Sequence, residues 1–140
     1  MDIRLVTPAD AALLDRVAQG VFDYAVDAAL TAEFLDDPRH HLCVAVDDGV
    51  VVGMASAVCY VHPDKRPQLW INEVGVAPSH QRRGFAAAIL RRLQALGRDL
   101  GCTEAWVLTD EVNGPARALY ASVGGAESTG VVMVTFPLED

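Results

Sequence analysis

The stretch that decides the fold is Gln81-Arg82-Arg83-Gly84-Phe85-Ala86, because it joins two strongly marked elements. A predicted strand ends near Val76 before it, and apolar residues recur at helical spacing from Gly84 to Leu100 after it. The first N–H groups of a helix have no partner within it, and the macrodipole adds partial positive charge there. The glycine leaves the backbone open, and the two arginines add charge. We therefore predict an anion site at this turn, suited to a phosphate.

Interpretations without a ligand stay open for this turn. Arginines before a helix are often solvated surface residues, and a glycine there can serve the turn alone. Two other phosphate motifs are excluded. No Gly-Lys-Ser/Thr follows, as a P-loop requires, and the Gly-x-Gly-x-x-Gly spacing of dinucleotide sites is absent.

The elements after this turn alternate between helix and strand. The helix from Gly84 to Leu100 has one apolar stripe and an opposite face that carries Arg91, Arg92, Gln94 and Arg98. Strand patterns follow at Glu104 to Thr109 and at Val131 to Phe136, with a short helix from Pro115 to Ser122 between them.

The elements before the turn are mostly strands. Ile3 to Val6 alternates as a strand, and Thr7 and Pro8 mark the start of a helix. Phe22 to Leu35 is a weaker helical stretch. The runs 42–46 and 50–58 form a predicted hairpin around Asp47-Asp48-Gly49, and residues 69–76 form the strand that leads to the turn. This order predicts one α/β domain over residues 1–140, with helices on both faces of a mixed sheet.

Composition limits the classes of protein. With 140 residues, 51% hydrophobic and 21% charged, the chain can bury one sizeable core. We expect a cytosolic protein without membrane segments, since no basic and apolar leader follows Met1 and no apolar run reaches about 20 residues. The three cysteines have no Cys-x-x-Cys pair and the four histidines have no metal-ligand spacing, so we expect buried thiols and no metal.

Charge is distributed unevenly. The net charge is −8, and residues 1–48 hold ten acids against three arginines, whereas residues 80–98 hold five arginines and no acid. An acidic chain disfavours nucleic acid as a partner and favours a cationic ligand. The local arginine cluster indicates one anionic ligand in addition.

From Trp70 to about Gly125 the chain resembles the GNAT acetyltransferases. Gln81-x-x-Gly84-x-Ala86 is similar to the family signature that cradles a pyrophosphate, with alanine where many members have glycine. Residues 71–76 resemble the family's fourth strand, and Asn113-x-x-Ala116-x-x-Leu119-Tyr120 followed by Gly124 resembles its later helix. The resemblance implies an α/β (α+β) fold with a mixed, mostly antiparallel sheet of six to seven strands, flanked by about four helices on both faces.

The resemblance also implies acetyl-CoA as the acetyl donor. Backbone amides of the turn would hold the pyrophosphate, and a bulge in the fourth strand, which Gly75 would tolerate, would admit the pantetheine arm. The implied cofactor-binding residues are Val74, Val76, Gln81, Arg82, Arg83, Gly84, Phe85, Ala86, Ala87 and Asn113.

Acyl transfer to an amine needs a base for the ammonium proton and an acid for the departing thiolate. Glu73 is the only carboxylate in the apolar strand from Trp70 to Val76, and half burial would suit it to accept a proton near neutral pH. The alternative is an outward-facing strand residue. Tyr120 is the acid that the resemblance implies, although a tyrosine on a helix is more often core packing.

The sequence gives weaker signals for the acceptor amine than for the acetyl donor. The acidic N-terminal part suits an aminoglycoside or another polycationic amine, although acidic helices can also serve solubility alone. The compact length and the run from Glu73 to Leu90 resemble the aminoglycoside 3-N-acetyltransferase branch. Candidate substrate-binding residues are Asp23, Asp27, Asp110 and Glu111; the last two could instead cap the next helix. A peptide or protein N-acetyltransferase and a non-catalytic acyl-CoA-binding module are the alternatives. A homodimer is left open.

Overall fold

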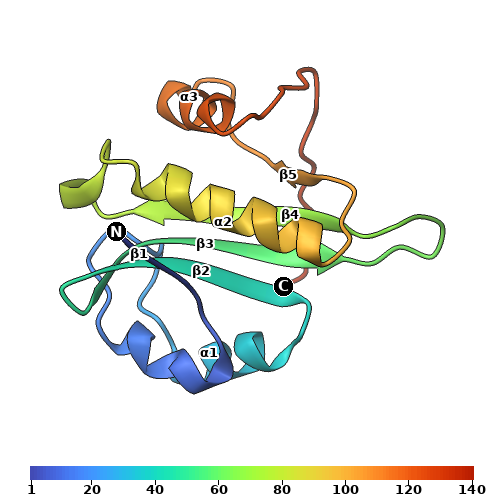
Figure 1. The fold of residues 1–140 in the computed structure, drawn as a ribbon. Coiled ribbons are helices and arrows are strands. Elements are labelled where there is room, and N and C mark those ends of the chain that lie inside the picture. Colours follow the sequence, from blue (N-terminus) through green and yellow to red (C-terminus); the bar gives the residue numbers. More distant parts are fainter.

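The computed structural model describes residues 1–140, and its framework is a five-stranded sheet with helices on both faces (Figure 1). The strands are β1 (Asp2–Leu5), β2 (His40–Asp47), β3 (Val50–Tyr60), β4 (Gln68–Val76) and β5 (Ala105–Val107). The α-helices are α1 (Ala28–Asp36), α2 (Phe85–Asp99) and α3 (Gly114–Ser122), and the 3-10 helices are η1 (Pro8–Asp15) and η2 (Pro78–His80). None of the helices is long and apolar enough to cross a bilayer.

The strands lie in the sheet in sequence order, β1-β2-β3-β4-β5. Three neighbouring pairs are antiparallel, and β4 and β5 are parallel, joined through α2. The predicted mixed, mostly antiparallel sheet is therefore confirmed. It has five strands rather than six to seven. The β2–β3 hairpin is confirmed, with Asp48 and Gly49 in the left-handed conformation that a tight hairpin turn needs.

The core lies between α2 and the sheet. Ile89, Leu90 and Leu93 of α2 are at most 2% exposed and pack on β2, β3 and β4. The opposite face of the sheet is covered by η1 and α1 (Figure 1). This arrangement fixes the start of α2 beside the carboxyl end of β4, which is where the sequence places the anion site.

The N-terminal helices differ from prediction. The segment after Thr7 is a 3-10 helix, in which the Thr7 hydroxyl donates to Asp10 at 2.8 Å. The second helix begins at Ala28 rather than Phe22, because Asp27 caps it by accepting a hydrogen bond from the Leu30 N–H at 2.8 Å. Residues 22–27 are left irregular.

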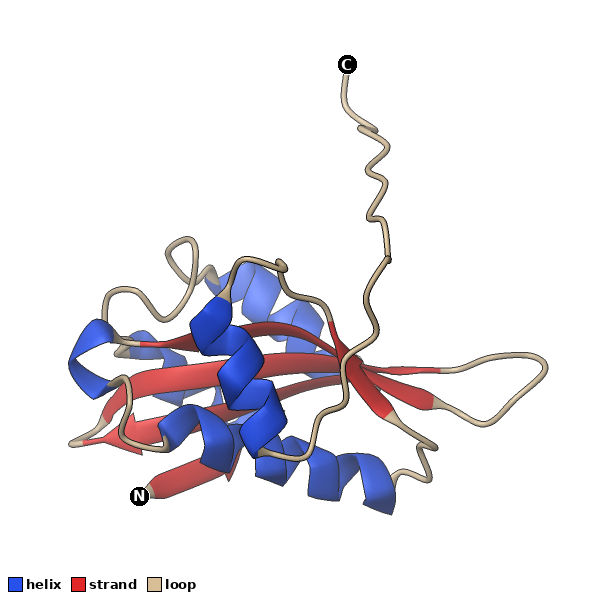
Figure 2. Cartoon of the chain, turned by 90° about the horizontal axis from the view of Figure 1, so that it is seen from above, coloured by secondary structure: helices blue, strands red, loops and turns tan.

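The expected last strand at Val131 to Phe136 is wrong as a member of the sheet. These residues pair with no strand and lie exposed in a segment that projects from the body (Figure 2). The predicted strand at Glu104 to Thr109 is likewise shortened to Ala105–Val107. The short β5 and the missing last strand are related, because β5 pairs with β4 on one side and with no strand on the other.

Candidate active site

The turn before α2 presents unpaired backbone donors. Arg82 (φ 62°) and Gly84 (φ 85°) are both left-handed, and such residues alternating with right-handed ones turn successive N–H groups toward one point. The N–H groups of Arg82 through Ala87 donate no hydrogen bond to residues outside α2. The first helical bond runs from the Ala88 N–H to the Gly84 carbonyl at 3.1 Å. The turn can therefore bind an anion with main-chain donors.

Gly84 serves this turn by its conformation and by its open surface. A side chain is strained at its positive φ. A Cβ placed there would have only the Met1 side chain nearby, at 3.9 Å. The space over the turn is thus free for a ligand.

Side chains from η2 and Gln81 hold the turn against the sheet. The Gln81 amide donates to the Val76 carbonyl at 3.1 Å, which ties the turn to the end of β4. His80 lies 2.7 Å from the Asp47 carboxylate of the β2–β3 hairpin and 2.7 Å from the Ser79 hydroxyl. The side chain of Gln81 is therefore occupied in positioning the turn.

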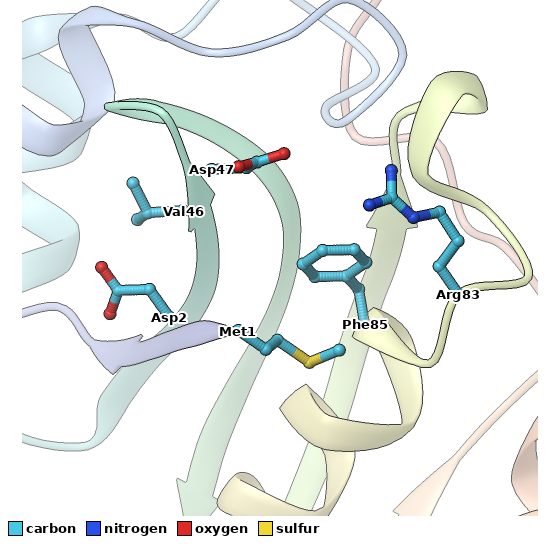
Figure 3. A pocket seen from close by; sticks show the side chains of 6 residues that line it. All are labelled: Met1, Asp2, Val46, Asp47, Arg83 and Phe85. Carbon is cyan, nitrogen blue, oxygen red and sulfur yellow. The ribbon is translucent and has the colours of Figure 1, made fainter.

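A cavity of about 440 Å³ lies beside the turn, lined by Met1, Asp2, Val46, Asp47, Arg83 and Phe85 (Figure 3). The Arg83 guanidinium stacks over the Phe85 ring at 5.5 Å, and the ring itself is buried. Arg83 therefore adds positive charge to the wall of this cavity.

A second feature is the opening between β4 and β5. The two strands pair at Leu69–Ala105, Trp70–Trp106 and Ile71–Val107, and then part. On the other side of β4, Glu73 is opposite Ser56 and Ile71 is opposite Ala57, so Asn72 is an extra residue on β4. The expected bulge exists, but it lies at Asn72 rather than at Gly75, and it coincides with the point where the strands part.

Gly75 has a different role. A Cβ at this position would collide with the main-chain carbonyl oxygen of Val21, so the segment after η1 crosses β4 in direct backbone contact. Val21 is itself 3% exposed. The glycine therefore seats residues 20–23 beside the opening.

Backbone direction makes part of β4 available to a ligand. The Ala77 N–H donates to Val52 of β3 at 2.8 Å, and successive residues of a strand point their polar groups to opposite sides. Val74 and Val76 therefore direct their groups away from β3, toward the opening. The Val76 carbonyl already accepts from Gln81, which leaves its N–H and both groups of Val74.

A cavity of about 340 Å³ occupies the opening and brings together Asp23, Asn72, Glu73, Asn113 and Tyr120. Glu73 is exposed, so the expected half burial is wrong. It nevertheless faces the same cavity as Tyr120.

Tyr120 is half-buried on α3, and burial raises its pKa above the ordinary range. The hydroxyl consequently keeps its proton at neutral pH. Asn113 caps α3 by accepting from the Ala116 N–H at 3.1 Å, and its amide N–H groups remain available to a ligand in the cavity.

The other predicted acceptor residues lie elsewhere. Asp27 caps α1, and neither Asp110 nor Glu111 lines the cavity. Their carbonyls instead accept from Asn113 N–H at 3.0 Å and from Arg117 at 2.8 Å, which shapes the loop before α3. Sequence reasoning missed Asn72, whose polar side chain beside Glu73 in an apolar strand was the available signal. It also missed Gly20 and Val21, which carry none.

Residues 12–124 match the acetyltransferase (GNAT) family. The chain belongs to this family. An aminoglycoside N(6')-acetyltransferase type 1 of Stenotrophomonas maltophilia is 31% identical over 98% of this chain and 94% of its own length. An uncharacterized N-acetyltransferase of Mycobacterium tuberculosis is 29% identical over 73% of this chain, and the match spans only 63% of that relative.

Solved structures share the GNAT fold. An aminoglycoside acetyltransferase from an uncultured soil metagenomic sample, in complex with trehalose, superposes with a TM-score of 0.85 at 19% identity, over 99% of this chain and 96% of that one. AAC(6')-Iy in complex with the bisubstrate analog CoA-S-monomethyl-acetylneamine gives 0.78 at 23%, over 97% of each. The aminoglycoside relatives whose names state a position are N(6') enzymes, which corrects the expected likeness to the 3-N branch.

Proposed function

We propose that this GNAT chain transfers the acetyl group of acetyl-CoA to a primary amine of a polycationic small molecule, by direct attack in a ternary complex. The observation that carries the proposal is the parting of β4 and β5 after Ile71 and Val107. The resulting cavity has Glu73 and Tyr120 in its wall, and the unpaired donors before α2 lie beyond the end of the same strand, β4.

The residues present fit coenzyme A. Main-chain N–H groups from Arg82 through Ala87 would hold its pyrophosphate, with the positive end of α2 behind them. Free backbone groups of Val74 and Val76 would pair with the amides of the pantetheine arm. When bound, acetyl-CoA supplies a thioester carbonyl as the electrophile and a thiolate as the leaving group.

Two side chains would move the protons. Glu73 takes a proton from the acceptor ammonium, directly or through a water, and so frees the amine lone pair to attack the carbonyl carbon. As the C–N bond forms and the C–S bond breaks, Tyr120 would donate its proton to the sulfur. The second proton that the nitrogen loses on becoming an amide would restore the Tyr120 hydroxyl through solvent. Because burial raises the pKa of Tyr120, its hydroxyl is protonated and ready for this step at neutral pH.

The acceptor class follows from charge. Asp23 and Glu73 line one cavity, and Asn72 adds a further polar group beside them. Two carboxylates at one opening attract a ligand with several ammonium groups, in a chain with a net charge of −8. The relative of S. maltophilia, an aminoglycoside N(6')-acetyltransferase by name, supports an aminoglycoside as that ligand.

An acetyl-CoA consumption assay with detection of free thiol would test the proposal across aminoglycosides, polyamines, amino acids and short peptides. We expect the largest kcat/KM with an aminoglycoside, and mass spectrometry should place one acetyl group on an amine of the product. A preference for peptides would support a peptide N-acetyltransferase instead. Tight acetyl-CoA binding without thiol release for any amine would identify a non-catalytic module.

A further inference from the structure

Two of the three cysteines lie side by side although they are distant in the chain. The Sγ atoms of Cys59 and Cys102 are 3.8 Å apart across a sequence separation of 43 residues. Both residues are partly exposed, whereas Cys43 is fully buried at 0% exposure. The expectation of buried thiols is therefore correct only for Cys43. The other two form a thiol pair at the edge of the core, within reach of a small reagent.

The backbone holds Cys59 in place. This residue lies near the end of β3, opposite Leu69 of β4, and its N–H donates to the Arg39 carbonyl at 2.8 Å. Facing residues of an antiparallel pair direct their side chains to the same face of a sheet. Leu69 is 0% exposed and lies beneath Gly97 of α2, so the Cys59 thiol is also on the α2 face.

Cys102 is held equally in the loop from α2 to β5. Its N–H donates to the Gly97 carbonyl at 2.9 Å, and the N–H of Thr103 donates to the Pro67 carbonyl at 3.0 Å. Gly97 lets the last turns of α2 approach this point, since a Cβ there would lie 3.9 Å from the Cβ of Cys102. Backbone hydrogen bonds on both sides therefore bring the two thiols together.

We propose that Cys59 and Cys102 are a modification site, which forms a reversible disulfide by exchange with a small disulfide such as oxidised glutathione. The sulfurs of a disulfide are about 2.05 Å apart, so the two side chains need to close a gap of under about 2 Å. Rotation about the Cα–Cβ bonds can move a thiol by that much while the backbone stays in place.

The exchange takes two steps. Burial raises the pKa of the Cys102 thiol to about 11, so this sulfur keeps its proton at neutral pH, and we assign the first attack to Cys59. The Cys59 thiolate attacks one sulfur of the small disulfide, whose S–S bond breaks and releases one small thiol. Cys102 then attacks the Cys59 sulfur, and its proton leaves with the second small thiol. The two cysteines are oxidised, and the small disulfide is reduced to two thiols.

The bond would fasten the short β5 strand. This strand pairs with β4 over three residues only, and it begins just after the loop that contains Cys102. Leu108 and Thr109, which follow β5, line the cavity of the candidate site. A covalent link from Cys102 to β3 would therefore steady this wall of the cavity. The bond does not rest on the proposed function, because it forms without acetyl-CoA or an amine.

Alkylation and mass spectrometry on the full chain test the bond. The folded protein is incubated with oxidised glutathione, and is then denatured and treated with iodoacetamide. We expect Cys43 to be the only alkylated cysteine, and a crosslink between residues 59 and 102 that dithiothreitol removes. Alkylation of all three cysteines, a lasting glutathione adduct on Cys59, or a bond that involves Cys43 or joins two chains would overturn the proposal.

Thermal melting and hydrogen exchange test the fastening of β5. The oxidised parent should melt about 5–15 °C above the reduced parent, because the bond closes a loop of 43 residues. Amide exchange over residues 103–109 should slow by at least about threefold. Cys43→Ala keeps the pair and should keep both effects, whereas Cys102→Ser, with its fold checked by circular dichroism, should lose both. A crosslinked parent with an unchanged or lower midpoint, or with unchanged exchange, would overturn the fastening.

Discussion

The two halves of the proposed site differ in the groups that they offer to a ligand. The donor half, which is β4, the turn and α2, offers backbone N–H and C=O groups whose directions are set by a strand and a helix. The acceptor half, which is residues 20–23 together with residues 108–113, offers side chains on irregular segments. Backbone sites are tied to regular elements and therefore leave a periodic pattern in the sequence, whereas the acceptor half depends on how two loops pack.

The largest expected effect is in the donor half. Gly84→Asp places a carboxylate over the N–H groups that we propose hold the diphosphate, and imposes a side chain at φ +85°. Loss of even two charge-assisted hydrogen bonds would weaken acetyl-CoA binding by at least about 100-fold. Isothermal calorimetry measures this directly. Gly84→Ala is the control, because it adds the strain without the charge, and it should bind more tightly than Gly84→Asp.

Tyr120→Phe should separate chemistry from binding. Removing the proton donor for the thiolate is expected to lower kcat by about 100-fold, in the range usual for one general acid. The Kd for acetyl-CoA should change by less than about threefold, since the turn before α2 is untouched. An unimpaired kcat would remove Tyr120 from the mechanism.

The pH profile gives a second check on Tyr120. Its raised pKa means that the acid form persists through alkaline pH and is lost only above the usual tyrosine range of about 10. We therefore expect that titration of Tyr120 does not lower kcat between pH 7 and about 9.5. Any fall of kcat in this range should also be present in Tyr120→Phe. A basic limb near pH 8 that is absent from the variant would contradict the burial argument.

Gly75→Ala tests how the two halves meet. The new Cβ collides with the Val21 carbonyl, so residues 20–23 must shift, and overpacking of this kind costs about 1–3 kcal/mol of stability. We expect a lower thermal midpoint and a raised KM for the amine. Gly97→Ala is the matched control, because Gly97 lies within α2 and its new Cβ would meet the Leu69 side chain at an ordinary contact distance of 3.4 Å. This substitution should be neutral or stabilising.

Asp23→Asn probes the acceptor half alone and should have the smallest effect. Loss of one carboxylate at the cavity is expected to raise the KM for a polycationic amine by about 5–10-fold and leave acetyl-CoA affinity unchanged. Asp27→Asn is a suitable comparison, because Asp27 caps α1 and asparagine caps equally well. Equal effects of the two substitutions would mean that Asp23 has no role in acceptor binding.

The elements that form the proposed donor half were mostly predicted from the sequence, and those of the proposed acceptor half were not. The α2 helix, the turn and the β4 strand followed from apolar spacing and one glycine, because these features are local. The bulge was misplaced to Gly75 because its cause, an extra residue at Asn72 opposite β3, appears only in the register of two strands. The contact of Gly75 with Val21 joins segments over 50 residues apart, and no local pattern marks it.

The segment from Val131 to Phe136 shows a second limit of prediction from sequence. Its residues have a clear strand pattern, and the prediction of a strand in the sheet was wrong because pairing needs a partner as well as propensity. The exposure of Glu73 likewise depends on the strands parting beside it, which the composition of β4 does not reveal.

A crystal structure of the chain soaked with coenzyme A would test the proposed cofactor site most directly. We predict the diphosphate on the main-chain N–H groups between Arg82 and Ala87, and the pantetheine arm between β4 and β5 with its sulfur near Tyr120. Coenzyme A bound anywhere else, with this turn empty and the two strands unoccupied, would contradict it.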